Sequence, residues 1–404
     1  MENMLSNRIK AMSESATLAM AAKAREFKAK GIDVISLSLG EPDFKTPKHI
    51  QEAAKAAIDE GKYFAYPPVN GYPDLREAIA AKLKRENGLD FGPNNIVVST
   101  GAKQSIANIM MALLNPGDEV VVFSPYWVSY AELIKLGEGI PVYVDGTIEN
   151  GFKVTAEQFE AAITDKTKLV IYSSPSNPTG AVFNAEETEA IAAVLRKHPN
   201  IIAISDEIYE YINFGDKHVS LGALEGMNDR VITVNGYSKG FAMTGWRIGY
   251  IAAPEWIAKA CNKIQGQITS GANSIAQRAA LAAITTDLGP TREMAEAYRG
   301  RRQLVLDLLN EIPGVKTYMP NGAFYIFPDV SAYFGTQFGD TEIKDAGDLC
   351  MYILNEAHVS LVTGQAFGAP NCVRISYAAS DDDLKEAMAR IKRVLAQLEP
   401  ATVA

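Results

Sequence analysis

The 404-residue sequence has little of what marks disulfide-stabilised, metal-binding or membrane proteins. Its three cysteines are odd in number and far apart, so we expect no disulfide framework and no paired-cysteine metal site. The four histidines lack the spacing of a zinc-binding helix, so no metal is expected. No run of about 18 apolar residues could span a bilayer, and residues 1–30 carry charges where a signal peptide would be apolar. We therefore expect a soluble, cytoplasmic protein.

The charge balance excludes two further kinds of partner. The chain has 39 basic and 48 acidic residues, a net charge of −9, and no cluster of Lys and Arg. Nucleic acids and anionic membranes are bound by basic patches, so neither is expected as a partner. Apolar residues make up 47%, which is enough for a sizeable core. At roughly 100 to 200 residues per domain, the length predicts two domains.

Apolar runs rich in branched residues alternate with helical patterns through the middle of the chain, which predicts an α/β sheet. The strands are nearly all apolar, as expected when helices cover both faces of a sheet. The expected strands are 96–99, 119–123, 141–144, 169–172, 201–205, 231–234 and 248–252, and the expected helices among them are 103–114, 185–197 and 255–265.

The pattern changes near Gly289 and Pro290, where a long charged helix is expected. Short strands and a final amphipathic helix follow, which predicts a second, α+β domain. The first ~45 residues have no obvious place in the large sheet, and we expect them to join this second domain. The predicted bounds are 1–46 for an N-terminal arm and part of the small domain, 47–290 for the large domain and 291–404 for the rest of the small domain.

The most informative segment follows the strand expected at 231–234. It ends in Ser238-Lys239, and Arg247 comes eight residues after the lysine. An amine in a turn of small residues can condense with an aldehyde, and an arginine can hold a phosphate dianion. Pyridoxal 5'-phosphate carries both groups. A lone lysine in a turn is usually a solvated surface charge, so this hypothesis depends on the other segments.

Asp206 and Tyr209 lie at and just after the end of the strand expected at 201–205. A buried carboxylate normally has a partner, because burying it alone is costly. A pyridinium nitrogen would be such a partner, and the pairing would keep the ring an electron sink; a helix N-cap is the alternative for Asp206. Tyr209 could donate to the phenolic oxygen of the same ring.

Two other loops follow strands. Asn177 lies in a loop made rigid by two prolines, 174–180, where it could bond the phenolic oxygen or form an ordinary Asx turn. The segment 99–105 joins a strand to a helix, whose first amides can bind phosphate. Lys103 opposes the dipole at the start of that helix, which suggests that it faces an anion.

Three more side chains stand out, two of them with two interpretations each. Trp127, just past a strand, could stack on a flat ring or belong to the core. Arg374 interrupts an apolar strand and could bind a carboxylate through two parallel hydrogen bonds, or form a structural salt bridge. Tyr66 is a loop tyrosine with no evident task of its own.

In this order, the segments resemble the class I, fold-type I, pyridoxal-phosphate-dependent aminotransferases, over about Ser15 to Leu398. Residues 39–44 and 322–325 also carry the resemblance. It implies an α/β large domain with a mainly parallel seven-stranded sheet covered by helices. A smaller α+β domain would come from the N- and C-terminal parts of the chain.

The resemblance also implies a role for each residue. Lys239 would be the catalytic residue that forms the Schiff base, and Asp206 the partner of the pyridine nitrogen. Tyr66 would reach the cofactor phosphate of a second subunit, so a homodimer with shared active sites is implied. The other implied roles are Tyr209 and Asn177 for the phenolic oxygen, Gly101, Ala102, Ser238 and Arg247 for the phosphate, Trp127 for stacking, and Arg374 with Gly40 for the α-carboxylate.

Two features of the sequence bear on the substrate: one differs from most of the family, and the other resembles one branch of it. Residues 267–273 contain no arginine, although many members of the family use one there, from the neighbouring subunit, to bind a distal carboxylate. Residues 101–104 and 125–130 are similar to the bacterial branch of aspartate aminotransferases, in which a lysine at the place of Lys103, beside the cofactor, contacts that carboxylate. Ser15 and Thr17 would assist, and Trp127 and Asn177 would border the substrate.

The implied reaction moves an amino group between L-aspartate and 2-oxoglutarate through a pyridoxal phosphate Schiff base, with ping-pong kinetics. Acceptance of prephenate or glutamate stays open. The first alternative is an aminotransferase for aromatic or neutral amino acids. A pyridoxal-dependent lyase ranks behind it, and a cofactor-binding regulator is disfavoured because the chain has no basic DNA-binding extension.

Overall fold

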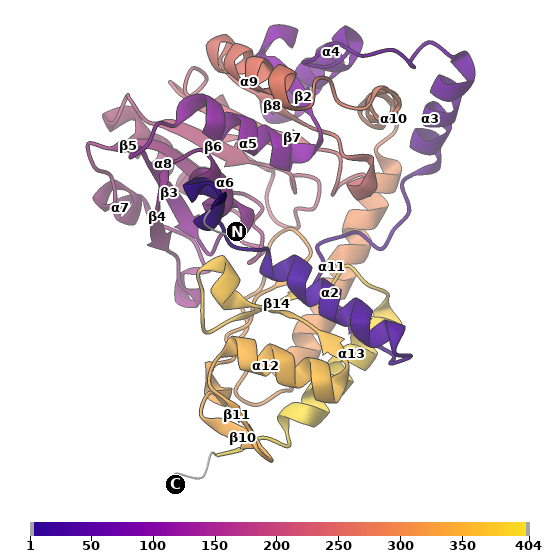
Figure 1. Ribbon diagram of the computed structural model, residues 1–404, viewed down its shortest axis with the longest axis vertical. Coiled ribbons are helices and arrows are strands. Elements are labelled where there is room, and N and C mark those ends of the chain that lie inside the picture. The colour runs from indigo at the N-terminus through magenta and orange to yellow at the C-terminus, as the bar shows by residue number, and fades with distance from the viewer. Residues whose placement is uncertain (1–3, 401–404) are drawn as a thin grey trace.

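A seven-stranded sheet forms one end of the molecule in the computed structural model, which describes residues 4–400 (Figure 1). The strand order is β2-β8-β7-β6-β5-β3-β4, and β8 runs antiparallel to both of its neighbours while the other pairs are parallel. This confirms the mainly parallel sheet predicted from the sequence. The strands are β2 (Ile96–Ser99), β3 (Glu119–Ser124), β4 (Ile140–Asp145), β5 (Thr167–Ser173), β6 (Ile202–Asp206), β7 (Val231–Gly236) and β8 (Gly249–Ala252).

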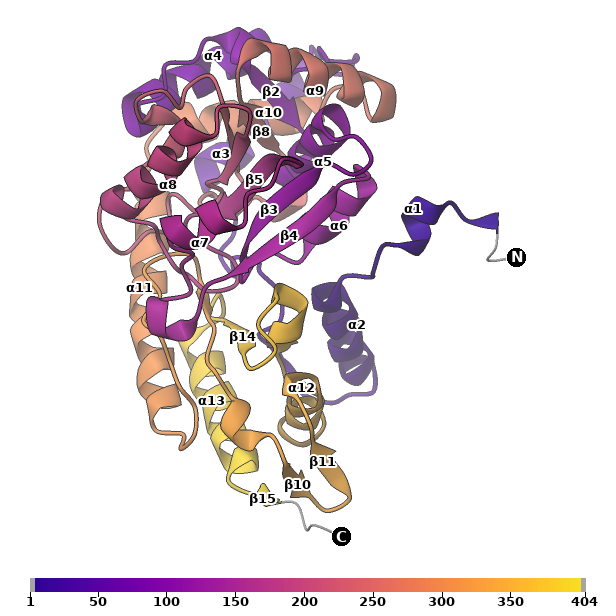
Figure 2. The ribbon, with the colours of Figure 1, turned by 90° about the vertical axis from the view of Figure 1, so that its left-hand side faces the viewer.

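Helices cover both faces of this sheet (Figure 2). Successive strand residues point to opposite faces, so Val120 and Val122 pack with α5 and its neighbours while Val121 packs on the other side. One cover consists of α5 (Gly101–Leu113), α6 (Ser129–Leu136) and α9 (Glu255–Ile268). The other consists of α7 (Ala156–Ala161), α8 (Ala185–Lys197), α3 (Lys48–Glu60), α4 (Pro73–Lys82) and α10 (Ser274–Thr285).

Local sequence sets where α8 begins. The Asn184 side chain accepts a hydrogen bond from the Glu187 amide at 2.9 Å, and the Glu187 carboxylate accepts one from the Asn184 amide at 2.8 Å. This capping box satisfies two amides that have no partner inside the helix. The helix therefore starts at Ala185, as the sequence predicts.

The smaller region joins the two ends of the chain. Strand β1 (Ile35–Ser36) pairs in parallel with β12 (Val359–Ser360), so the N-terminal segment does join the C-terminal part. The long helices α11 (Gly289–Asn310) and α13 (Asp381–Leu395) contribute to one core with strands β14 and β9 of the sheet β13-β14-β9. Its strands are β13 (Val362–Thr363), β14 (Val373–Ser376) and β9 (Tyr325–Ile326). The exact domain bounds remain a prediction.

The other elements of this end surround that core or extend from it. They are α2 (Ala16–Ala29), α12 (Ala346–Tyr352), β10 (Thr336–Phe338), β11 (Thr341–Ile343) and β15 (Glu399–Pro400). Helix α1 (Asn7–Lys10) instead contacts α6 of the large region, where Arg8 forms an ion pair with Glu138. Three X-Pro bonds are cis, before Pro125, Pro175 and Pro178. Among residues 4–400, none of the helices combines the length and apolar character needed to cross a bilayer.

Candidate active site

A cavity of about 570 Å³ opens at the carboxyl ends of β5, β6 and β7, the edge where ligands bind in sheets of this kind. Most of the residues predicted from the sequence line it: Gly40, Ala102, Lys103, Trp127, Asn177, Asp206, Tyr209, Ser238, Lys239 and Arg247. The sequence analysis did not select some other lining residues, among them Arg25, Glu41 and Tyr130.

Lys239 follows β7 and reaches into this cavity. Its Nζ donates a hydrogen bond to the Gly40 carbonyl and lies 5.7 Å from the centre of the Tyr209 ring and 5.8 Å from that of Phe324. Burial, and then the charge of Arg374, lower the pKa of the amine to about 8. A neutral amine is therefore accessible near neutral pH, and only the neutral form acts as a nucleophile or base.

Asp206 ends β6 and is almost completely buried. Its carboxylate accepts hydrogen bonds from the Tyr130 hydroxyl at 2.6 Å and from the Ile208 amide at 3.3 Å. Burial raises the pKa of the carboxyl to about 6, although the Tyr130 hydrogen bond lowers it. A cation bound in front of Asp206 would favour the ionised form. The Tyr130 contact was missed from the sequence, although this residue lies in segment 125–130, just beyond β3.

Arg374 lies in β14 with its side chain only 2% exposed. It donates to Asn177 Oδ1 at 2.8 Å and to the Ser38 carbonyl at 2.6 Å, and its Nε has no partner. The rings of Tyr325 and Phe367 lie 4.6 and 4.8 Å from the guanidinium. Within residues 4–400 no acidic side chain forms an ion pair with it, so an anionic ligand would supply the missing charge.

Gly101 and Arg247 form a cationic corner at the start of α5. Gly101 is the first residue of the helix with φ +78°, and the Arg247 guanidinium occupies the space where a side chain at position 101 would lie. Arg247 donates to the Thr244 carbonyl at 3.0 Å. The free amides of a helix start and an arginine beside them favour the same ligand, a dianion. Ser238 lines the same cavity and is buried.

Lys103 lies at the mouth of the cavity. Its Nζ is 5.0 Å from the centre of the Trp127 ring, and partial burial and the charge of Arg247 lower its pKa. Lys103 also borders a second cavity of about 530 Å³, which Ser15 lines. The structure thus brings Ser15 near Lys103, whereas Thr17 lines neither cavity.

Tyr66 does not line the cavity of its own chain, and its side chain is 96% exposed. Its loop is held to the sheet by Gln265, whose buried amide donates to the carbonyls of Val69 at 2.6 Å and Val98 at 2.8 Å. Tyr66 therefore projects from a loop with a fixed end, and a role in a second subunit stays a prediction.

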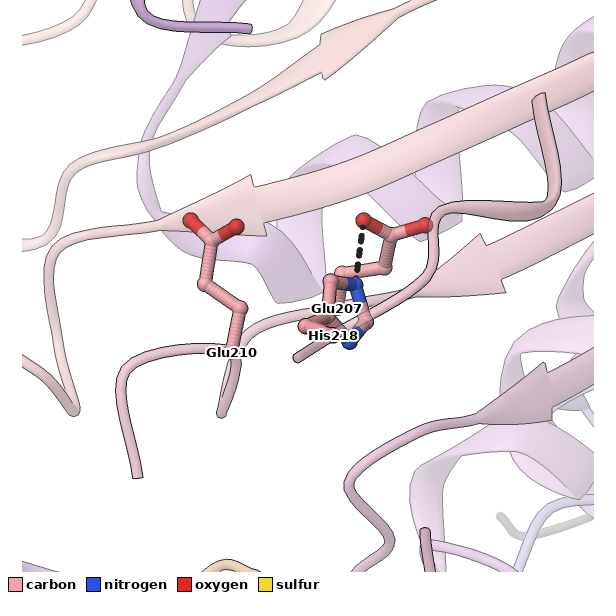
Figure 3. Close-up of side chains that lie close together, drawn as sticks. All are labelled: Glu207, Glu210 and His218. Carbon is pink, nitrogen blue, oxygen red and sulfur yellow. Dashed lines mark hydrogen bonds and ion pairs between the residues drawn. The ribbon is translucent and has the colours of Figure 1, made fainter. Parts of the chain in front are cut away.

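A cluster of charged groups, drawn in Figure 3, lies on and near the segment that follows Asp206 and does not line the cavity. Glu207, Glu210 and His218 lie close enough together to resemble a metal site, and His218 Nε2 is 2.9 Å from Glu207 Oε2. However, the Lys82 ammonium already forms an ion pair with Glu210. The Ser220 hydroxyl donates to Glu207 at 2.6 Å. Lys82 thus supplies the positive charge that a metal ion would otherwise bring.

Comparison with known proteins agrees with this geometry. Residues 32–391 match the family model "Aminotransferase class I and II". The chain is 46% identical to an aspartate/prephenate aminotransferase of Cereibacter sphaeroides, over 98% of this chain and 99% of the relative. It is also 46% identical to a bifunctional aspartate aminotransferase and glutamate/aspartate-prephenate aminotransferase of Petunia hybrida, over 98% of this chain and 84% of the relative.

Solved structures show the same likeness. An aspartate aminotransferase of Rhizobium meliloti matches with a TM-score of 0.94 and 42% identity, over 98% of this chain and all of that one. An aspartate aminotransferase of Thermus thermophilus with maleate matches with a TM-score of 0.91 and 43% identity, over 96% of this chain and 99% of that one. This chain is an enzyme of the class I and II aminotransferase family.

Proposed function

We propose that this chain is an aspartate aminotransferase that uses pyridoxal 5'-phosphate to move an amino group between L-aspartate and 2-oxoglutarate. One observation carries the proposal: Lys239, Asp206 and Arg247 converge on one cavity, and none of them has an ion-pair partner among residues 4–400. The names of the relatives support the substrate, because they include aspartate, and the Thermus structure holds maleate, a dicarboxylate.

The residues fit the cofactor. The buried Asp206 carboxylate, with its pKa raised to about 6, fits a pyridinium nitrogen. The free amides after Gly101, together with Arg247, fit a phosphate. Asn177 accepts from Arg374 through Oδ1, which leaves its amide nitrogen as a donor for the phenolic oxygen. When bound, the cofactor supplies an aldehyde for linkage to an amine and a cationic ring that takes up electrons from the adjacent carbon.

The protein residues then bind, orient and move protons. Lys239, whose amine has a pKa of about 8, removes the α-proton of the amino acid as a base and returns it as an acid. Arg374, which has no acidic partner among residues 4–400, holds the α-carboxylate by charge-assisted hydrogen bonds. Lys103, at the mouth of the cavity, holds the distal carboxylate. The two cations together fix a four-carbon or five-carbon diacid with its α-carbon toward Lys239.

We also propose a cytoplasmic homodimer in which Tyr66 completes the partner's phosphate site. The support is the almost complete exposure of Tyr66 on a loop that Gln265 holds in place. The domain bounds 1–46, 47–290 and 291–404 belong to the same proposal.

The test is to mix purified protein, saturated with the cofactor, with L-aspartate and 2-oxoglutarate. Oxaloacetate and glutamate appearing together support the proposal. Release of ammonia or pyruvate would indicate a lyase, and no reaction would indicate a binding protein. Comparing kcat/KM for aspartate, glutamate, prephenate, phenylalanine and alanine separates an aspartate enzyme from the aromatic or neutral alternative. Borohydride should attach the cofactor to the peptide that contains Lys239.

A further inference from the structure

We propose that Tyr325 is a positioning residue that makes Tyr209 a hydrogen-bond donor toward the cofactor's phenolic oxygen. The inference deepens the proposed function and rests on it, because Tyr209 acts on the cofactor and Tyr325 acts through Tyr209. Tyr325 does not line the cavity itself.

The two hydroxyls form one buried hydrogen bond. Their oxygens are 2.7 Å apart, and the side chains of Tyr325 and Tyr209 are 0% and 2% exposed. The rings meet edge to face, with centroids 5.8 Å apart and an interplanar angle of 78°. Each phenol can donate one proton, so a single question decides the function of the pair: which of the two donates to the other.

Arg374 decides the direction. Its guanidinium lies 4.6 Å from the centre of the Tyr325 ring, and its positive charge lowers the pKa of Tyr325 against the rise that burial causes. The same charge also lowers the pKa of Tyr209, but among residues 4–400 the guanidinium lies over the Tyr325 ring and not over that of Tyr209, so its effect favours Tyr325 as the more acidic phenol. The more acidic phenol is the better donor, so Tyr325 donates to Tyr209. Tyr209 then keeps its own proton for an oxygen in the cavity, and a hydroxyl that accepts one hydrogen bond donates another more strongly.

Backbone contacts hold Tyr325 in this place. It pairs with Ser376 of β14, two residues after Arg374, so the tyrosine and the arginine lie on adjacent strands with a fixed register. A side chain at Gly40 would collide with the Tyr325 hydroxyl. The hydroxyl is therefore enclosed between Gly40 and Tyr209.

Tyr325→Phe tests the proposal because it removes one oxygen and keeps the ring. The readout is a pH titration of the visible absorption of the protein reconstituted with pyridoxal phosphate. A weaker donor leaves more negative charge on the phenolic oxygen, which then holds the neighbouring imine proton more strongly. We expect the pKa of that band to rise by about half a unit to one unit, the equivalent of one hydrogen bond.

A double-mutant cycle separates positioning from a general structural effect. Tyr209→Phe should raise the same pKa by more than Tyr325→Phe does, and Tyr325→Phe should add nothing once Tyr209 is Phe. Tyr377→Phe is the matched control: Tyr377 is also 0% exposed, in the same core, and its hydroxyl donates to the Ala323 carbonyl at 3.1 Å instead. We expect it to titrate like the wild type.

Three results would overturn the inference: a wild-type titration for Tyr325→Phe, an equal shift for Tyr377→Phe, or a full additional shift in the Tyr209→Phe background. Should Tyr325→Phe fold poorly, Gly40→Ala displaces the same hydroxyl and should shift the pKa in the same direction. A wild-type protein that develops no titrating band with the cofactor would instead refute the proposed function.

Discussion

Two groups of charged side chains near the segment that carries Asp206 and Tyr209 differ in whether they have partners of opposite charge. In the rear cluster, which consists of Lys82, Glu207, Glu210 and His218 and does not line the cavity, Lys82 and Glu210 form an ion pair almost without exposure to solvent. The front groups, Asp206 and Lys239, line the cavity, and neither has an ion-pair partner among residues 4–400. Burying an unpaired charge is costly, whereas a paired one can be accommodated. The rear cluster therefore serves the fold, and the front groups are arranged for a ligand.

The largest expected difference between the two groups comes from Lys239→Ala. Loss of the amine removes both the nucleophile and the proton carrier, and we expect kcat to fall by about four orders of magnitude. The stability of the cofactor-free protein should not decrease, because the amine is desolvated without an ion-pair partner. Initial rates with aspartate and urea unfolding measure the two effects. A variant that keeps a tenth of wild-type activity would contradict the assignment.

Lys82→Met should give the reverse pattern. It leaves the buried Glu210 carboxylate without its cation, and breaking such a pair costs about 3 to 5 kcal/mol. Urea unfolding of the cofactor-free protein measures this loss. Lys259→Met is the matched control, since its ion pair with Glu255 is exposed and weak by comparison. Equal stability of the two variants would show that the rear cluster is not structural.

The sequence predicted the front of the site better than the rear. Asp206 and Lys239 each follow an apolar strand, and the carboxyl ends of parallel strands meet at one edge, so their convergence could be inferred. The bond between Lys82 and Glu210 joins residues 128 positions apart, on a helix and a loop. Hydrophobic periodicity tells which residues are buried but not which polar partners they meet.

The same limit explains the phenolic contacts. The hydroxyl of Tyr130 reaches Asp206 across 76 positions, and that of Tyr325 reaches Tyr209 across 116. Both tyrosines lie in segments that carried the family resemblance, so their neighbourhood was predictable. The Tyr130 contact depends on how α6 packs on the large sheet, and the Tyr325 contact on how the small region packs against the segment after β6. The pattern of a single chain contains neither.

Lys103→Ala should change the binding of aspartate alone, which separates the role of Lys103 in the cavity from the role of Lys239 in the reaction. Loss of a charge-assisted hydrogen bond of about 1.5 to 3 kcal/mol should raise KM for aspartate about ten- to a hundredfold. The KM values for alanine and phenylalanine should change little, because these substrates have no distal carboxylate. Steady-state kinetics with the three amino acids provide the test. A uniform rise for all three would remove the side-chain role.

The smallest expected effect concerns His218 and the dependence of stability on pH. Burial is the largest single effect on the pKa of His218 and lowers it, as does the charge of Lys82. The carboxylates of Glu207 and Glu210 together outweigh both effects, so the net pKa is raised. A histidine whose pKa is higher in the folded than in the unfolded protein stabilises the fold while it is protonated. This stabilisation is complete below the pKa of the unfolded state, about 6.5, and is lost as pH rises through the pKa of the folded state.

We therefore expect the free energy of unfolding of the cofactor-free wild type to fall as pH increases from 6 into the alkaline range. His218→Gln should lose this slope, since glutamine does not titrate. His198→Gln serves as the control, because His198 lies 3.8 Å from Glu160 and outside the rear cluster. If His218→Gln keeps the wild-type pH dependence, protonated His218 does not stabilise the rear cluster, and the ion pair of Lys82 with Glu210 alone supplies its electrostatic stabilisation.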